Sequence, residues 1–328
     1  MHPQLLEILR CSKSGQRLRL EKPEYLNQCI QSGWLVSEDN QHRYPIRDFI
    51  PRFVPESNYA DNFGMQWNRF RQTQLDSYSG HPISAHRFWQ ATGWKPEELN
   101  GQWVLDAGCG AGRFAEVALQ AGAQVIALDY SSAVDACYAN LKQYQNLHVV
   151  QGDIYALPFP EKFFPFVYSL GVLQHTPNVA KAFAALPPMV AGGGQLCVDF
   201  YWKRLQTLLH PKYLLRPITK RMRKEQLFRL LERWVPVGLP ISQGFGRIPV
   251  LGRLLKRLVP VADYTGRYPL SSQQLQEWAL LDTFDMLSPE YDQPQTVVTV
   301  QRWFEEAGFV EVAVFHAGHL VGKGYKPA

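Results

Sequence analysis

Short apolar runs alternate with amphipathic stretches through the middle of the chain. Apolar residues recur at helical spacing over 113–120 and about 132–143, which predicts two helices. Between and after them lie short, β-branched or continuous apolar segments of strand type. Five strands are expected, at residues 103–107, 124–129, 148–150, 164–169 and 195–201. Strands that alternate with helices indicate a parallel sheet covered on both faces, so the pattern predicts an α/β fold.

Beyond residue 201 the pattern changes. Residues from about 203 to 292 are leucine-rich, basic and helical in spacing, and they interrupt the strand–helix alternation. The alternation resumes with a helix at 295–307 and strands at 310–315 and from Leu320 onward. The sequence therefore predicts a helical insertion within the sheet domain.

Two further units precede the sheet. Residues 1–56 are expected to form a small domain, because prolines at 51 and 55 disfavour helix and favour an extended exit. Residues 57–100 mix aromatic and polar groups and predict a helical connector with two helices. The sheet domain with its insertion then occupies residues 101–328.

Composition agrees with a globular chain of 328 residues. Hydrophobic residues make up 46% and charged residues 19%, and no apolar run approaches the roughly 18 residues of a membrane helix. The N-terminal residues lack the basic start and apolar stretch of a secretory signal. Five widely spread cysteines do not suggest a disulfide framework, so a cytoplasmic location is expected.

Positive charge is concentrated in the insertion. Residues 201–267 contain 15 Lys and Arg against three acidic residues, a net charge of +12, whereas the whole chain carries +5. Such a segment attracts an anionic substrate, a nucleic acid or an acidic membrane surface. A solvated face of amphipathic helices explains the same pattern without a ligand.

A glycine-rich turn follows the first predicted strand. The run Asp-Ala-Gly-Cys-Gly-Ala-Gly at 106–112 has alternate glycines, which let the backbone turn tightly and approach a ligand with no Cβ in the way. A tight strand-to-helix connection without a ligand would use the same residues. The neighbouring positions must therefore decide whether a nucleotide binds, and which one.

Two carboxylates favour a methyl donor. Asp129 ends the next strand, 21 positions after Gly108, where it can accept both hydroxyls of an adenosine ribose in NAD or S-adenosylmethionine. Asp106 discriminates between NAD and S-adenosylmethionine. A dinucleotide presents an anionic pyrophosphate to the turn, whereas a methionine moiety presents an ammonium group that a carboxylate attracts.

A third element lies after the strand at 148–150. There Asp153 can accept from the adenine amino group, while the backbone N–H of Ile154 donates to the ring. Asp153 taken alone also fits a residue that caps a turn.

With residues 168–176 (YSLGVLQHT), these elements resemble the class I S-adenosylmethionine-dependent methyltransferases, in the type 11 and quinone-biosynthesis-like branch. The resemblance covers about 101–200 and the final helix and strands. It implies a Rossmann-like seven-stranded sheet of order 3-2-1-4-5-7-6, with the last strand antiparallel, and S-adenosylmethionine as the cofactor. The cofactor-binding residues that it implies are Asp106, Ala107, Gly108, Cys109, Gly110, Asp129, Tyr130, Asp153, Ile154 and Leu170.

The N-terminal unit carries a weaker resemblance. Cys11 in the run CSKSGQRL, together with residues 44–51, resembles the small zinc-ribbon-like domain that accompanies some methyltransferases and activates tRNA-modifying ones. Ser14 stands where a metal-binding relative has a second cysteine, and only Cys29 remains as another thiol. Four tetrahedral ligands cannot be assembled from these cysteines, so we expect no structural zinc and a packing or partner module.

The acceptor is expected near the insertion. Ligands of open α/β sheets bind outside the carboxyl ends of the strands, so the insertion should cover the transferable methyl as a lid. Methyl transfer needs alignment first, and a base where the nucleophile must lose a proton. The candidate bases are His175, Asp285 and Tyr291. A loop histidine and helix-capping or arginine-paired aspartates are the structural alternatives.

The leading hypothesis is a methyltransferase acting on O, N or C of a small or medium-sized acceptor that is anionic or amphiphilic. One alternative makes RNA the acceptor, although no recognised RNA-binding signature is present. Another is a non-catalytic protein that keeps the donor pocket and binds a membrane surface or a partner through amphipathic stretches such as 250–258.

Overall fold

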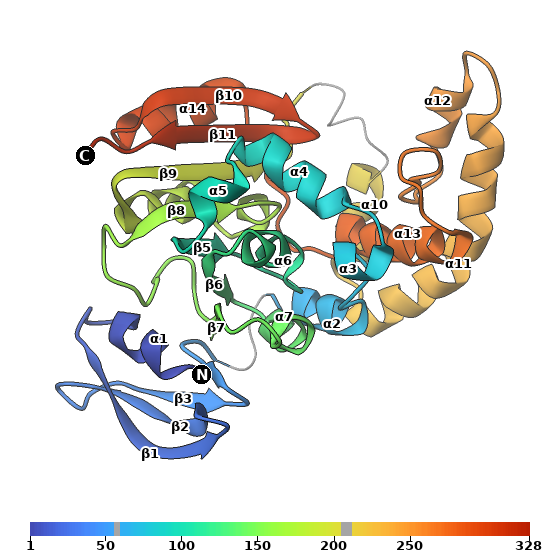
Figure 1. Ribbon diagram of the computed structural model, residues 1–328. Coiled ribbons are helices and arrows are strands. Elements are labelled where there is room, and N and C mark those ends of the chain that lie inside the picture. The colour runs from blue at the N-terminus through green and yellow to red at the C-terminus, as the bar shows by residue number, and fades with distance from the viewer. Residues whose placement is uncertain (56–59, 205–211) are drawn as a thin grey trace.

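The computed structural model describes residues 1–55, 60–204 and 212–328. Figure 1 shows a central sheet with helices on both faces, a small N-terminal sheet at one side and a group of helices at the other.

The central sheet has seven strands. They are β5 (Trp103–Ala107), β6 (Gln124–Asp129), β7 (Leu147–Gln151), β8 (Phe164–Ser169), β9 (Val190–Phe200), β10 (Val310–Ala317) and β11 (His319–Tyr325). They lie in the order β10-β11-β9-β8-β5-β6-β7. The strands from β5 to β9 pair in parallel, and β11 is antiparallel to both of its neighbours. Counted from β5, this order is 3-2-1-4-5-7-6, so the predicted fold is confirmed.

Both faces of the sheet are buried because alternate residues of each strand point to opposite sides. Leu105 and Ile126 belong to the core beneath α8 (Val179–Ala184) and α14 (Val297–Glu306). Val104 and Val125 belong to the opposite core, which the next helices cover. These helices are α4 (Ile83–Thr92), α6 (Arg113–Gln120) and α7 (Ala133–Leu141).

The connector contains more helices than its pattern predicts. Besides α4, the structure describes α2 (Asp61–Arg69), α3 (Asp76–Ser79) and α5 (Pro96–Leu99), while residues 57–59 lie outside the described part. Helices α3 and α5 have four residues each, too short for helical periodicity to show. Asn68 of α2 donates to the Ser132 carbonyl oxygen at 2.9 Å, which holds α2 beside the start of α7.

The insertion forms its own helical layer. Its helices are α10 (Lys212–Thr219), α11 (Lys224–Gly246), α12 (Gly252–Lys256) and α13 (Ser272–Leu287). Leu227, Leu231 and Val235 of α11 pack into one core with Phe284 and Leu287 of α13. In Figure 1, α11 and α12 lie at the side of the molecule farthest from the N-terminal sheet.

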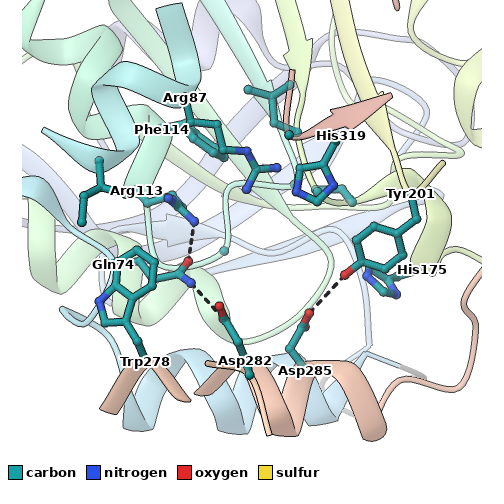
Figure 2. A pocket seen from close by; sticks show the side chains of 18 of the residues that line it. Gln74, Arg87, Arg113, Phe114, His175, Tyr201, Trp278, Asp282, Asp285 and His319 are labelled. Atoms are coloured by element: carbon teal, nitrogen blue, oxygen red, sulfur yellow. Dashed lines mark hydrogen bonds between the residues drawn. The ribbon is translucent and has the colours of Figure 1, made fainter. Parts of the chain in front are cut away.

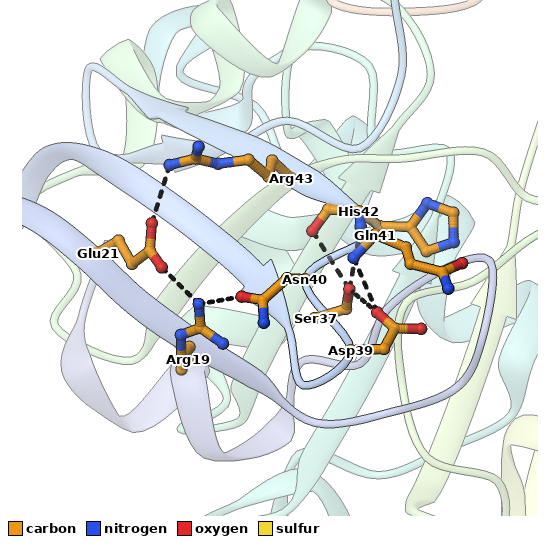
Figure 3. Close-up of polar contacts among 8 residues, drawn as sticks. All are labelled: Arg19, Glu21, Ser37, Asp39, Asn40, Gln41, His42 and Arg43. Atoms are coloured by element: carbon orange, nitrogen blue, oxygen red, sulfur yellow. Dashed lines mark hydrogen bonds and ion pairs between the residues drawn. The ribbon is translucent and has the colours of Figure 1, made fainter.

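The N-terminal unit begins with α1 (Pro3–Ile8), followed by an antiparallel sheet of four strands. The strands are β1 (Leu18–Leu26), β2 (Cys29–Ser37), β3 (Arg43–Arg47) and β4 (Ile50–Pro51), paired in that order. Surface charges join the strands, since Glu21 accepts from Arg19 at 2.6 Å and from Arg43 at 2.8 Å (Figure 3). Asp39 accepts from the Ser37 hydroxyl in the β2–β3 turn, and this bond lowers the pKa of Asp39.

The chain leaves this unit along the edge of the main sheet. Arg52 forms a parallel bridge with Gln151 of β7, and the Phe53 N–H donates to the Gln151 carbonyl oxygen at 2.8 Å. The Arg52 guanidinium donates to the Gln151 side chain at 2.8 Å and to Asp135 of α7 at 2.7 Å. Arg52 therefore fastens the N-terminal unit to a strand and a helix of the larger domain.

Arg52→Ala is expected to lower the free energy of unfolding by about 1–2 kcal/mol, because it removes two side-chain hydrogen bonds at a partly buried junction. Urea unfolding measures the change. Arg19→Ala is the matched control, since Arg19 is also ion-paired but its side chain is 46% exposed, against 13% for Arg52. Equal losses in the two variants would contradict the fastening role.

Candidate active site

A cavity of about 1380 Å³ opens at the carboxyl ends of the parallel strands. Its wall includes Gly108 after β5, Asp129 at the end of β6, Gly152 after β7 and Tyr201 after β9, and the insertion supplies the opposite side. Ligand pockets usually measure about 300–1,000 Å³. The cavity therefore has room for a cofactor and a second molecule.

The glycine turn forms one end of the cavity. Gly108 has φ +104°, and a Cβ there would lie 2.4 Å from a methyl group of Val172, so only glycine fits. The N–H groups of Gly108 and Cys109 donate to the Leu128 carbonyl oxygen at 2.7 and 2.9 Å. Gly108, Cys109 and Gly110 all line the cavity, with their backbone held against β6.

Asp129 is fixed beside this turn. One carboxylate oxygen accepts from the Gly110 N–H at 2.9 Å, and the other accepts from the Ser131 N–H at 2.9 Å and hydroxyl at 2.7 Å. Burial raises the pKa of Asp129, although these hydrogen bonds oppose the shift. Asp129 and Tyr130 both line the cavity. The arrangement holds an oriented acceptor where the second strand ends.

Asp106 and Ala107 lie behind the turn and are not among the described residues that line the cavity. Asp106 is 2% exposed, and its Oδ2 atom has no hydrogen-bond partner in the described part of the chain. Burial raises the pKa of Asp106 to about 8. Asp106 belongs to β5, and the strand register places it beside Tyr168 of β8. The predicted direct contact with a ligand ammonium therefore has no support from this geometry.

The residues expected to contact adenine also differ in whether they line the cavity. Ile154 and Leu170 line the cavity, whereas Asp153 is not among its described lining residues. Asp153 instead accepts from the Tyr155 N–H at 2.9 Å, which is the turn-capping alternative.

Two aromatic residues that sequence reasoning did not select, Phe63 and Trp67 of α2, complete this end of the cavity. A Cβ built on Gly110 would lie 3.2 Å from the Trp67 indole nitrogen, so the ring covers the glycine turn. The aromatic content of residues 57–100 was the available signal, but it did not indicate which rings face the cavity.

His175 lines the cavity from the short helix η1 (Leu173–His175). Its Nδ1 atom is 3.0 Å from the Tyr291 carbonyl oxygen. A carbonyl oxygen only accepts, so Nδ1 carries the hydrogen and Nε2 of the neutral ring keeps its lone pair. The ring packs 5.4 Å from both Phe63 and Tyr201, measured between centroids. His175 thus has the tautomer that a general base requires.

The candidate base Asp285 and a second aspartate of α13, Asp282, face the same space (Figure 2). Asp285 accepts from the Tyr201 hydroxyl at 3.4 Å. Asp282 accepts from Gln74 at 3.0 Å and from the Tyr264 hydroxyl, and burial raises its pKa to about 6.

Tyr291 is a different case from the two aspartates. Its side chain is not among the described residues that line the cavity, and its main-chain carbonyl is what meets His175. The geometry gives no support to Tyr291 as a base.

Cations dominate the remaining wall. Among the described lining residues, seven Lys and Arg stand against three carboxylates. Arg87 is ion-paired with Asp199 at 2.7 Å, and Arg113 donates to Gln74 at 2.8 Å. Burial and the charge of Arg87 lower the pKa of Arg113 to about 10, so it remains protonated at neutral pH. The part of the cavity away from the glycine turn therefore attracts an anion.

No group of three His, Cys, Asp or Glu suited to a metal ion occurs in the described part of the chain. In the N-terminal unit, the Cys11 sulfur lies 3.2 Å from the Tyr44 hydroxyl, in a buried contact. None of the helices that the structure describes is long and apolar enough to cross a bilayer.

The strand order, with the glycine turn and the carboxylate at the end of β6, is that of the class I S-adenosylmethionine-dependent methyltransferase fold. Residues 105–198 match the family described as "Methyltransferase domain", and residues 2–48 match the family described as "Trm112p-like protein". The chain thus contains a methyltransferase domain of this class and a Trm112-like N-terminal unit.

Curated relatives share part of the methyltransferase domain. A malonyl-[acyl-carrier protein] O-methyltransferase of Erwinia billingiae is 38% identical over 100 residues, which cover 29% of this chain and 38% of the relative. A ubiquinone biosynthesis O-methyltransferase of Pseudomonas fluorescens is 31% identical over 133 residues, covering 34% and 56%. The matches therefore span less than two thirds of these relatives.

Among solved structures, a "putative s-adenosyl-l-methionine-dependent methyltransferase" of Methanococcus maripaludis matches with a TM-score of 0.45 and 13% identity. The match covers 84% of this chain and 96% of the other.

Proposed function

We propose that the chain binds S-adenosylmethionine and transfers its methyl group to O, N or C of a small or medium-sized anionic acceptor. One observation carries the proposal. A single cavity brings together the glycine turn with Asp129, the oriented ring of His175 and a wall rich in cations. Free thiols at all five cysteines support action in the cytoplasm.

The residues present fit the cofactor. Gly108 and Gly110 expose backbone to the methionine end, Asp129 can accept from the ribose hydroxyls, and Ile154 offers apolar contact to adenine. When bound, S-adenosylmethionine supplies an electrophilic methyl group on a sulfonium. The Trp67 ring covers the glycine turn at this end of the cavity.

The chain's own residues would then orient the acceptor and hold its proton. Arg113, which donates to the neutral side chains of Gln74 and Ser84, attracts an acidic group, and this attraction aligns the nucleophile. Where that nucleophile is a hydroxyl or an amine, Nε2 of His175 accepts the proton that it loses. The hydrogen bond from Nδ1 to the Tyr291 carbonyl keeps the ring in place during this step.

His175→Asn is expected to lower kcat by about 10²- to 10⁴-fold, because the proton acceptor is lost, while affinity for S-adenosylhomocysteine stays unchanged. Steady-state kinetics and calorimetry measure the two quantities. His316→Asn is the control, since His316 also lines the cavity but packs on Trp202 instead of bonding a carbonyl. Unchanged kcat in His175→Asn would mean that transfer proceeds without this base.

The proposed function is tested by calorimetry with S-adenosylhomocysteine and by a mass-shift screen of acidic metabolites against their neutral esters. We expect micromolar or tighter binding and methylation of acids in preference to esters. Affinity for NAD with none for S-adenosylhomocysteine would overturn the cofactor assignment. Preferential methylation of the esters would contradict the proposal that the acceptor is anionic.

A further inference from the structure

The outer side of the insertion exposes an unusual number of apolar side chains. Of the eighteen large hydrophobic residues that are exposed in the described part of the chain, ten lie between residues 214 and 258. Six of them belong to residues 241–258, which comprise the end of α11, a turn and α12, here called the docking tip. They are Ile241, Ile248, Val250, Leu251, Leu254 and Leu258.

Folding of the insertion does not account for these side chains. Its core takes Val235 and Leu239 from one face of α11. Leu230, Val237 and Ile241, spaced by seven and four residues, form a stripe on the exposed face. At the turn, the Val250 side chain is 97% exposed, although a β-branched residue with φ +63° is sterically unfavourable. The apolar surface of the docking tip therefore has no partner within the described residues.

Basic residues accompany this surface. Residues 214–258 contain eleven Lys and Arg against two Glu, a net charge of +9. Arg233, Arg247 and Arg257 are exposed and form no ion pair with any described residue. Apolar side chains interleaved with cations match the apolar interior and phosphate surface of an anionic bilayer. A soluble protein partner would need acidic groups around an apolar centre, whereas a bilayer supplies both over any area.

The docking tip is continuous with the cavity. Leu254, Arg257 and Leu258 belong to the exposed surface and also to the cavity lining. A surface that binds the docking tip thus lies at the mouth through which an acceptor enters.

We infer that the docking tip binds the surface of an anionic phospholipid bilayer and places the cavity mouth against it. Apolar side chains of the tip enter the boundary between headgroups and acyl chains, and the exposed arginines contact lipid phosphates. The acceptor then includes amphiphilic acids that partition into this boundary. That last statement rests on the proposed function, whereas bilayer binding itself does not.

Vesicle sedimentation with the full chain tests the inference. We expect the protein to sediment with phosphatidylcholine vesicles that contain about one third phosphatidylglycerol, and at least about tenfold less with pure phosphatidylcholine. Val250→Asp with Leu251→Asp should lower binding to the anionic vesicles by at least about tenfold, because two apolar contacts become repulsive charges. Neither residue is among the described lining of the cavity.

Val297→Asp with Val298→Asp is the matched control, since these adjacent valines are exposed at the start of α14, which lies outside the docking tip. It should bind vesicles like the wild type. Thermal melting and calorimetry with S-adenosylhomocysteine, both without vesicles, report folding and the donor site separately. Hydrogen exchange should show protection by vesicles at residues 248–258 and none in the N-terminal sheet.

Equal vesicle binding by the two double variants would overturn the inference. Failure of the wild-type protein to sediment with anionic vesicles would also overturn it. A dimer that dissociates only in the Val250, Leu251 variant would assign the tip to a second copy of this chain. Salt-sensitive retention on RNA without vesicle binding would instead mean that the basic residues of the insertion bind nucleic acid.

Discussion

Asp129→Ala is expected to weaken the binding of S-adenosylhomocysteine by at least about 100-fold. The loss combines two charge-assisted hydrogen bonds to the ribose, each contributing about 1.5–3 kcal/mol. The substitution also releases the Gly110 N–H and Ser131, which the carboxylate holds at 2.7–2.9 Å. Calorimetry with the ligand measures the change, and a thermal melt confirms that the variant is folded.

Two further variants sharpen this test. Asp129→Asn keeps the shape and one acceptor oxygen, so a loss of about tenfold is expected. Asp135→Ala removes a nearby carboxylate that pairs with Arg52 and is not among the described cavity residues, so affinity should stay near that of the wild type. Normal affinity in Asp129→Ala would remove the basis for placing the ribose at this position.

Arg87→Ala is expected to lower the free energy of unfolding by about 3–5 kcal/mol, because it leaves a buried carboxylate without its cation. The Asp199 side chain is 1% exposed and accepts from Arg87 at 2.7 Å and from the Gly171 N–H at 2.5 Å. Urea unfolding measures the loss. Arg302→Ala breaks the exposed pair with Glu306 and should cost less than about 0.5 kcal/mol.

The difference between wild type and Arg87→Ala should narrow as the pH falls. Burial acts to raise the pKa of Asp199, but the charges of Arg87 and His319 and the hydrogen bonds from Arg87 and Gly171 together hold this pKa below the ordinary value of 3.8. A lowered folded pKa gives stability that is present above the unfolded pKa and is lost as the pH falls through the folded pKa. Without Arg87, burial raises the pKa of Asp199, so the variant regains stability on protonation. A difference that is the same at pH 7 and pH 4 would contradict this account.

Sequence patterns predicted the parts of the candidate site that depend on residues close together in the sequence. The strand–turn–helix at Gly108 requires glycine at a left-handed φ, and Asp129 follows from the length of one helix and one strand. The sheet order followed from the resemblance and was confirmed by the pairing. Asp106 and Asp153 lie beside these motifs, but neither is among the described residues that line the cavity, and Asp153 accepts from the Tyr155 N–H instead.

The acceptor side depends on tertiary packing and was predicted only in part. His175, Asp285 and the cations reach one cavity from η1, α13, α4 and α6, which are distant in sequence. Arg87 and Arg113 carry no local signal that separates them from surface arginines. Tyr291 was predicted from its closeness to the returning chain and is not among the described residues that line the cavity.

The bridge between Arg52 and β7 also affects how the protein behaves in solution. Strand β7 ends the main sheet on one side, and the backbone groups of an uncovered edge strand pair readily with other molecules. Residues 52 and 53 occupy part of that edge, and the N-terminal unit stands beside it. The unit therefore protects the methyltransferase domain from self-association through its sheet, and a chain cut back to that domain would be prone to aggregate.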